Sequence, residues 1–463
     1  MVINLKTSEI TAGKMDMLHG PIWNKLIQYA LPVAATGILE QLFNASDVAI
    51  VGNFTGNSRT VAVAAVGANG PIVSLILNFF IGIALGVNVV IATAIGKKDE
   101  NSVHKAVHTS IIMSLIGGLL VTILGELFIG QLFQMLNVPD DVLPYALLYI
   151  RIYLLGMPVI LLYNFESAIF RSIGETKTPL KALAISGILN VLLNLFFVVV
   201  LKMTVNGVAI ATVISNLISS VLLFIKLSKT DQIIRIRKQE LKFDIEIFRR
   251  ILQIGLPAGI QTAVFSVANI VIQSAINSLG TIVIAASSAA FNIEIFAYDI
   301  LNSFSQACTT FTGQNYGANQ LKRCKKVLFI CLIEDAIATA SAIILVLLSG
   351  KFLLSIFNND PQVINLGYTR LVMVFSAYTF SMLYENMSGY LRGFGISMVP
   401  AFLTIIGVCG IRILWIFTVF PSHQTFRAIL TAYPVSLSVT AILIFISVII
   451  YRPSHKYRNQ AHI

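Results

Sequence analysis

Two carboxylates and a carboxamide lie inside one apolar stretch near the start of the chain. Glu40, Asn44 and Asp47 fall within residues 28–51 at spacings of four and three residues, so on a helix they share one face. A charged side chain at mid-membrane costs about 2.5 to 3.5 kcal/mol on insertion scales. We therefore expect this face to point into the protein or a cavity, either to meet an ion or ligand or to tie the helix to its neighbours.

A second polar pair lies in the sequence ILNVLLN. Asn190 and Asn194 are four residues apart, so they also share a helix face. Carboxamide and carboxylate oxygens are ligands for a hard cation such as sodium, whereas one carboxylate is enough for a proton. The alternative is hydrogen bonding between helices, worth about 0.6 kcal/mol on average.

The second half of the chain has its own polar stripe. Asp299, Asn302 and Gln306 follow the spacing of one helix face, and Glu294 and Tyr298 lie on the same apolar stretch. We expect Glu294, Tyr298, Asp299 and Asn302, together with Glu40 and Asn44 of the first half, to line a substrate cavity. For the aromatic residue, ordinary packing is the alternative.

One arginine of the second half lies deep within an apolar stretch, at residues 399–420. Arg412 cannot lose its charge, so it needs an acid if it is buried. At 1.5 Å per residue, Arg412 and Glu294 lie at about the same depth, roughly 12 to 13 Å from the outer face. We predict that they form a structural ion pair.

These residues must be positioned by membrane-spanning helices. Of 463 residues, 56% are hydrophobic and 11% are charged, against about 25% charged in soluble domains. Windows of about 19 residues predict an all-α polytopic membrane protein with twelve transmembrane helices, at residues 28–51, 64–95, 106–130, 143–165, 181–201, 207–227, 253–277, 285–313, 327–349, 365–388, 399–420 and 428–450.

The 32 lysines and arginines indicate the orientation. Most of them fall in the segments that are cytoplasmic if the N-terminus is inside, as the positive-inside rule requires. We expect a multi-pass protein of the plasma (inner) membrane with both termini cytoplasmic. Topology then explains the net charge of +11, and no nucleic-acid partner is expected.

The chain contains an internal repeat. YNFESAIFRSIGETKTP (residues 163–179) aligns without gaps with YENMSGYLRGFGISMVP (residues 384–400) at an offset of 221. Six spans are duplicated, and because six is even the two six-helix lobes are parallel repeats. The predicted organisation is a cytoplasmic N-terminal segment, first lobe, cytoplasmic linker, second lobe and cytoplasmic tail, at residues 1–27, 28–227, 228–252, 253–450 and 451–463.

Two parallel lobes suggest transport by alternating access, with the cavity between them. The chain has no G-x-x-x-x-G-K-[ST] motif, so ATP hydrolysis in this chain is not expected. We expect no cofactor, a coupling ion that is H⁺ or Na⁺, and a monomer in the lipid bilayer.

The combination of motifs resembles the multidrug and toxic compound extrusion (MATE) family. It comprises the Leu-Pro openings of spans 1 and 7, SDVAIVG at the end of span 1, FRSIGETKTP after span 4 and GQNYGANQ after span 8. The resemblance covers essentially the whole chain. It implies a V-shaped pair of lobes and antiport of small organic, usually cationic, compounds against protons or sodium.

The resemblance also implies site residues. Asp47 stands at the position of the family's span-1 aspartate, and Thr212 fits its hydroxyl ligand. Asp47, Asn190, Asn194 and Thr212 are therefore the expected ion-coupling set, with Asp47 as a metal ligand if the ion is sodium. At Asn194 many members carry aspartate, and LPAGIQTAVFS lacks the span-7 glutamate of members whose ion site is in the second lobe.

Two other classes of membrane protein share part of this pattern, a flippase and a prenyltransferase. A lipid-linked oligosaccharide or lipid flippase of the same superfamily would share the repeat, but it would usually have a basic cavity for phosphates. A membrane prenyltransferase would need paired aspartate-rich motifs, and NND at residues 358–360 is single. The acidic spans favour the exporter.

Overall fold

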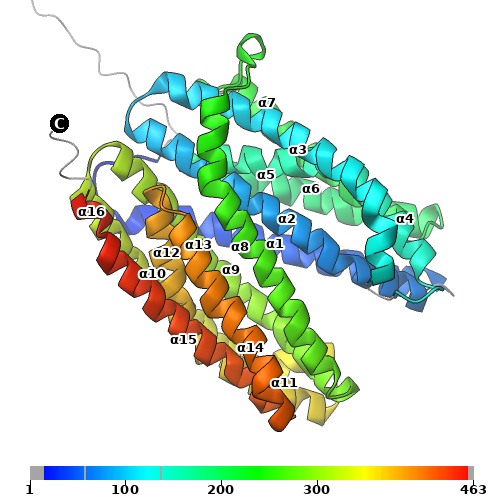
Figure 1. Ribbon diagram of the computed structural model, residues 1–463. Coiled ribbons are helices and arrows are strands. Elements are labelled where there is room, and N and C mark those ends of the chain that lie inside the picture. Colours follow the sequence, from blue (N-terminus) through cyan, green and yellow to red (C-terminus); the bar gives the residue numbers. More distant parts are fainter. Residues whose placement is uncertain (1–14, 57–58, 136–137, 457–463) are drawn as a thin grey trace, which may run out of the picture.

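The computed structural model describes residues 15–56, 59–135 and 138–456, and this part of the chain is helical without strands (Figure 1). The predicted cytoplasmic N-terminal segment (1–27) and tail (451–463) lie partly outside the described residues, which leave out 1–14 and 457–463. In the first half the helices are α1 (Trp23–Phe54), α2 (Arg59–Gly96), α3 (Glu100–Met135), α4 (Leu143–Leu155), α5 (Met157–Ser172), α6 (Lys177–Leu195) and α7 (Val205–Lys229). In the second half they are α8 (Ile245–Asn277), α9 (Thr281–Gly317), α10 (Leu321–Phe357), α11 (Pro361–Phe375), α12 (Tyr378–Gly393), α13 (Met398–Thr404), α14 (Ile411–Thr418), α15 (Phe426–Tyr451) and α16 (Pro453–Lys456).

The predicted twelve-span layout is confirmed, with two spans broken. Among the described residues, ten helical segments are long and apolar enough to cross a membrane, and α4 with α5, bent by 52°, makes an eleventh. The twelfth expected span, 365–388, is built from α11 and α12. The break after α4 lies at Gly156 and the break after α11 includes Ala377, which are 221 residues apart, so the repeat extends to the helix breaks.

The spans carry apolar side chains on their outer surface, as a lipid environment requires. Leu348, Phe417 and Ile450 are 82%, 70% and 71% exposed, which would be costly in water. Two helices contain π-helical turns, Phe196–Val200 after α6 and Ile405–Gly410 between α13 and α14. Such turns often lie near functional sites.

The helices form two bundles. In Figure 1, α1 to α7 make one bundle and α8 to α16 the other, and the two diverge from the end where α16 lies toward the end where α4 and α11 lie. The segment between α7 and α8 is residues 230–244, shorter than the predicted linker because α8 begins at Ile245. Each bundle has its own apolar core, and α2 packs along α8 and α9 where the bundles meet.

Two glycines related by the 221-residue repeat allow a very close approach of the bundles. A Cβ on Gly96 of α2 would lie 2.0 Å from the carbonyl oxygen of Gln314, and a Cβ on Gly317 of α9 would lie 2.1 Å from that of Thr93. Thr93 and Gln314 are themselves 221 residues apart. The two halves therefore meet symmetrically at this end, and only glycine allows the backbones to come so close.

Buried hydrogen bonds join the bundles at the same end. Thr310 of α9 donates to Asn88 Oδ1 of α2 at 2.9 Å and contacts the Tyr29 hydroxyl of α1 at 2.8 Å. Gln314 Nε2 donates to the carbonyl oxygen of Ser172 at 2.7 Å. We call this end, with its glycine contact and these hydrogen bonds, the closed end.

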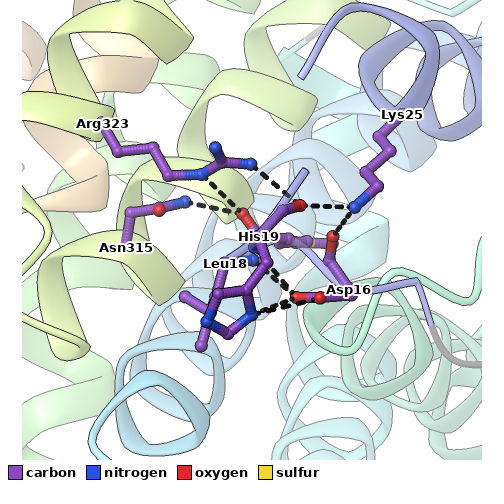
Figure 2. A network of polar contacts seen from close by, with 7 residues as sticks. Asp16, Leu18, His19, Lys25, Asn315 and Arg323 are labelled. Atoms are coloured by element: carbon purple, nitrogen blue, oxygen red, sulfur yellow. Dashed lines mark hydrogen bonds and ion pairs between the residues drawn. The ribbon is translucent and has the colours of Figure 1, made fainter. Parts of the chain in front are cut away.

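The segment before α1 also crosses to the second bundle (Figure 2). Asn315 of α9 donates to the carbonyl oxygen of Met17 at 3.1 Å, and Arg323 of α10 donates to those of Met17 and His19, both at 3.3 Å. Met17 is buried, and it packs against the turn at Gly174 in the first bundle. Residues 15–22 therefore bridge the two bundles at the closed end.

Candidate functional site

The four residues of the expected ion-coupling set come together between α1, α6 and α7. Asp47 Oδ1 accepts a hydrogen bond of 2.5 Å from Asn194 Nδ2, and Asp47 Oδ2 accepts one of 3.3 Å from Thr212 Oγ1. Asn194 Nδ2 also donates to Asn190 Oδ1 at 3.1 Å, and Asn190 Nδ2 reaches Thr212 Oγ1 at 3.5 Å. We call Asp47, Asn190, Asn194 and Thr212 the Asp47 cluster.

The Asp47 cluster is deeply buried and has one oxygen left over. Asp47, Asn190 and Asn194 are 7%, 4% and 0% exposed. Both donated bonds of Asn194 end on oxygen atoms, which fixes its amide orientation, and its Oδ1 has no hydrogen-bond partner among the described residues. A buried acceptor without a donor is costly, and a cation close to the Asp47 carboxylate would satisfy it.

Close packing of α1 on α6 brings the cluster together. The ring of Phe43 lies against Gly187, where a Cβ would be 1.8 Å from Phe43 Cε2. Asp47 is one turn beyond Phe43, and Asn194 is two turns beyond Gly187. The glycine therefore lets the helices approach until the carboxylate meets the carboxamide.

The other two polar residues on this face of α1 are not part of the Asp47 cluster. Asn44 is exposed, so it does not share the buried surroundings of Asp47. Glu40 is partly buried, and it lies near Arg171 of α5 and Asp299 of α9. The polar face of α1 therefore has two parts. Asp47 belongs to the buried Asp47 cluster, and Glu40 lies with Arg171 and Asp299 where the two bundles meet, which we call the junction of the bundles.

At that junction two carboxylates approach from different bundles. The carboxyl group of Asp299 packs against the backbone of α1 at Gly37, three residues before Glu40. Asp299 is partly buried, and its Oδ2 has no hydrogen-bond partner among the described residues. Arg171 is held nearby by a hydrogen bond of 3.1 Å from its Nη1 to Gln306 Oε1.

Tyr298 and Asn302 of the expected cavity set are also partly buried on α9. The Tyr298 hydroxyl donates to Glu385 Oε1 of α12 at 3.5 Å, and Glu385 Oε2 is 3.9 Å from Arg392 Nη1. Arg392 in turn donates to Gln261 of α8 at 2.9 Å. This network was not predicted from the sequence. The pairing of Glu385 with Arg392, two turns apart on one helix, was its only sequence signal.

The predicted ion pair between Glu294 and Arg412 is wrong. Glu294 instead accepts two hydrogen bonds from Arg370 of α11, Nε to Oε1 at 2.8 Å and Nη2 to Oε2 at 2.9 Å. Glu294 and Arg370 are 4% and 3% exposed, so Glu294 is also not free to line a cavity. The reason is helix packing: α9 lies beside α11, whereas α14, which carries Arg412, packs on α8 and α15.

Arg412 finds neutral partners. Its Nε donates to the Ser436 hydroxyl at 3.0 Å, and its guanidinium lies 4.3 Å from the centre of the Tyr433 ring. Arg370 lies on the same ring at 5.6 Å. The buried arginines are therefore held by one bidentate carboxylate and by cation–π contacts.

Comparisons with known protein sequences match this chain to a single family model and to several bacterial transporters. The family model MatE matches residues 32–196 and 257–418. The chain is 25% identical over 434 residues to the probable multidrug resistance protein YoeA of Bacillus subtilis, with 92% of this chain and 93% of YoeA covered. It is 26% identical over 360 residues to an FAD transporter of Shewanella oneidensis, with 75% and 77% covered.

A solved structure shows the same fold. An outward-facing multidrug resistance MATE family transporter of the MOP superfamily matches with a TM-score of 0.86 at 22% identity. The match covers 94% of this chain and 97% of that protein.

Proposed function

Because this chain belongs to the MatE family, a family of membrane transporters, we propose that it exports organic, mainly cationic compounds in exchange for protons or sodium. The chain is thus a transporter and not an enzyme. The observation that carries the proposal is the Asp47 cluster, a buried carboxylate with an unpaired carboxamide oxygen beside it. Buried acids of this kind in membrane spans usually serve an ion or proton pathway.

The ion would bind where Asp47 meets Asn194 and Thr212. Their carboxylate, carboxamide and hydroxyl oxygens suit sodium. A proton needs Asp47 alone, and with one carboxylate in the Asp47 cluster we favour the proton. In either case the bound cation neutralises a charge that is expensive at this depth, so binding can alter the packing of α1 against α6 and α7.

The substrate would bind at the junction of the bundles, near Glu40 and Asp299. Two carboxylates near one arginine favour a cationic compound. The Bacillus subtilis relative is a probable multidrug resistance protein, which supports export of organic compounds in general. The FAD transporter supports a second candidate, an anionic substrate. Such a substrate, like the phosphate-linked one of a flippase, would require more positive charge than Arg171 supplies.

We infer that both termini are cytoplasmic in the plasma membrane, since most of the basic residues lie in the segments on that side of the membrane. We also infer that the chain acts as a monomer. The closed end is then the cytoplasmic end. Alternating access would open it by separating α2 from α9 at Gly96 and Gly317.

The glycine contact gives the first prediction. Gly96→Ala should keep the closed end open, because the added methyl group would collide with the Gln314 carbonyl. Spin labels on cysteines at Lys181 and Lys322, both exposed beside the closed end, should report a longer distance, and transport should fall. Gly67→Ala on the same helix is the control, since no atom lies within 4 Å of its Cβ position. An unchanged distance in Gly96→Ala would contradict this role.

The substrate assignment gives the second prediction. Glu40→Gln and Asp299→Asn should each raise the KM for a monovalent cationic dye by about tenfold, since each removes one charge contact worth about 1.4 kcal/mol. Transport of a neutral compound of similar size should hardly change. The measurement is the initial rate of dye uptake into everted vesicles at several dye concentrations. If Glu40→Gln and Asp299→Asn instead improve transport of an anionic compound, an anionic substrate is the better candidate.

A further inference from the structure

We propose that the second bundle holds a second site for a monovalent cation, formed by Asp335 and Thr339 of α10 and Asn386 of α12. The site goes beyond the proposed function, because it would make two cations, one in each bundle, part of the cycle.

The three side chains form a compact hydrogen-bonded group. Asp335 Oδ1 accepts a hydrogen bond of 2.7 Å from Thr339 Oγ1, and Asp335 Oδ2 accepts one of 2.5 Å from Asn386 Nδ2. Asp335 and Asn386 are fully buried, and Thr339 is 3% exposed. The Asp335 carboxylate has two donors, but no arginine or lysine of the described residues forms an ion pair with it.

The carboxamide of Asn386 leaves an oxygen free at this group. Its Nδ2 donates both to Asp335 and to the carbonyl oxygen of Met382 at 3.0 Å. Since both partners are acceptors, the amide orientation is fixed. The Oδ1 is then buried without a hydrogen-bond partner among the described residues. A carboxylate, a free carboxamide oxygen and a hydroxyl are a donor set for a small hard cation.

The Asp47 cluster has the same chemistry. In both places an aspartate accepts from one asparagine and one threonine, and the second oxygen of that asparagine is buried without a partner. The two groups are not related by the repeat, because Asp335 and Asn386 correspond to Ser114 and Phe165 at the 221-residue offset. Duplication of one site therefore does not explain the likeness, and a shared ligand does.

The other ionisable groups near Asp335 do not neutralise it. Glu334 and Cys331 of α10, Cys308 of α9 and Glu385 of α12 are neutral or acidic. The guanidinium of Arg392, on the same helix as Asn386, contacts Glu385 and Gln261 instead. A proton or a sodium ion would supply the missing positive charge, and the shared chemistry is neutralisation of the Asp335 carboxylate.

Cation binding to the purified full-length chain tests the proposal in two arms. In the first, radioactive sodium is measured by equilibrium dialysis with choline replacing sodium. In the second, proton uptake between pH 8.5 and 5.5 is measured in choline medium. If the ion is sodium, wild type should bind two per chain, Asp47→Asn and Asp335→Asn one each, and the double variant none. If it is a proton, each single variant should take up about one proton fewer than wild type.

A matched control and a second variant complete the test. Glu334→Gln removes a buried carboxylate one position away that makes no hydrogen bond to Asn386 or Thr339, and in the sodium arm it should bind as wild type does. Thr339→Val keeps the side-chain shape and guards against misfolding of Asp335→Asn. It should weaken sodium binding about tenfold by removing the hydroxyl ligand, and it should strengthen proton uptake because the Asp335 carboxylate loses a hydrogen-bond donor. Unchanged sodium and proton binding in both Asp335→Asn and Thr339→Val would overturn the second site. Unchanged binding in Asp47→Asn alone would overturn the Asp47 cluster instead.

Discussion

Replacing Asp47 by asparagine should abolish export against a concentration gradient while leaving the fold intact. Asparagine has nearly the shape of aspartate and can still accept the hydrogen bond that Asn194 donates to Asp47 Oδ1. It cannot exchange a proton, and it lacks the charge that would hold sodium among Asn190, Asn194 and Thr212. We expect dye efflux from energised cells to fall to the level of cells without the transporter.

The control for this variant lies on the same helix. Asn53 is exposed near the end of α1, where its amide donates to the carbonyl oxygen of Ala49, and Asn53→Ala should export normally. Protein amount and thermal stability should match wild type in both variants. Wild-type rates of uphill efflux in Asp47→Asn would mean that the coupling ion binds elsewhere.

Arg370→Met should be the most destabilising single change in the second bundle. It leaves the Glu294 carboxylate buried without the two hydrogen bonds that now satisfy it, and breaking such a pair costs about 3 to 5 kcal/mol. Glu294→Gln in the same chain should restore part of the loss, because the stranded charge is then gone. Unfolding of the purified protein in detergent measures the free-energy changes.

Arg412→Met is the matched control for this prediction. Arg412 is equally buried, but it contacts the Ser436 hydroxyl and the Tyr433 ring, so its loss should cost about 1 to 2 kcal/mol. A larger loss for Arg412→Met than for Arg370→Met, relieved by Glu294→Gln, would reinstate the pair predicted from the sequence.

The sequence predicts the membrane architecture well because two strong signals agree. Long apolar stretches define the spans, and the alignment of residues 163–179 with 384–400 defines the repeat. Helical periodicity and the resemblance together also found the Asp47 cluster. Asn190 and Asn194 share a face by spacing alone, but the resemblance was needed to bring Asp47 and Thr212 to them.

The wrong ion pair of Glu294 with Arg412 and the missed contact of Asp335 with Asn386 have a common physical cause. Spacing gives the depth of a residue along its own helix, but not which helix lies beside it. Glu294 and Arg412 have similar depths, yet α9 packs against α11 and not α14. The helix break after Phe375 makes α11, which carries Arg370, a separate helix within the predicted span 365–388. The contact of Asp335 with Asn386 depends on packing between α10 and α12, which spacing does not reveal.

The most direct test of the account reverses the direction of coupling. Because coupling between two ligands is reciprocal, a substrate gradient alone should drive the cation uphill. Proteoliposomes would be loaded with a cationic substrate and diluted into substrate-free medium, with equal pH and equal sodium on both sides. We predict that outward substrate flow carries protons or sodium inward in the wild type and that this movement is lost in Asp47→Asn. Substrate flow through the wild type without any cation movement would contradict cation-coupled export.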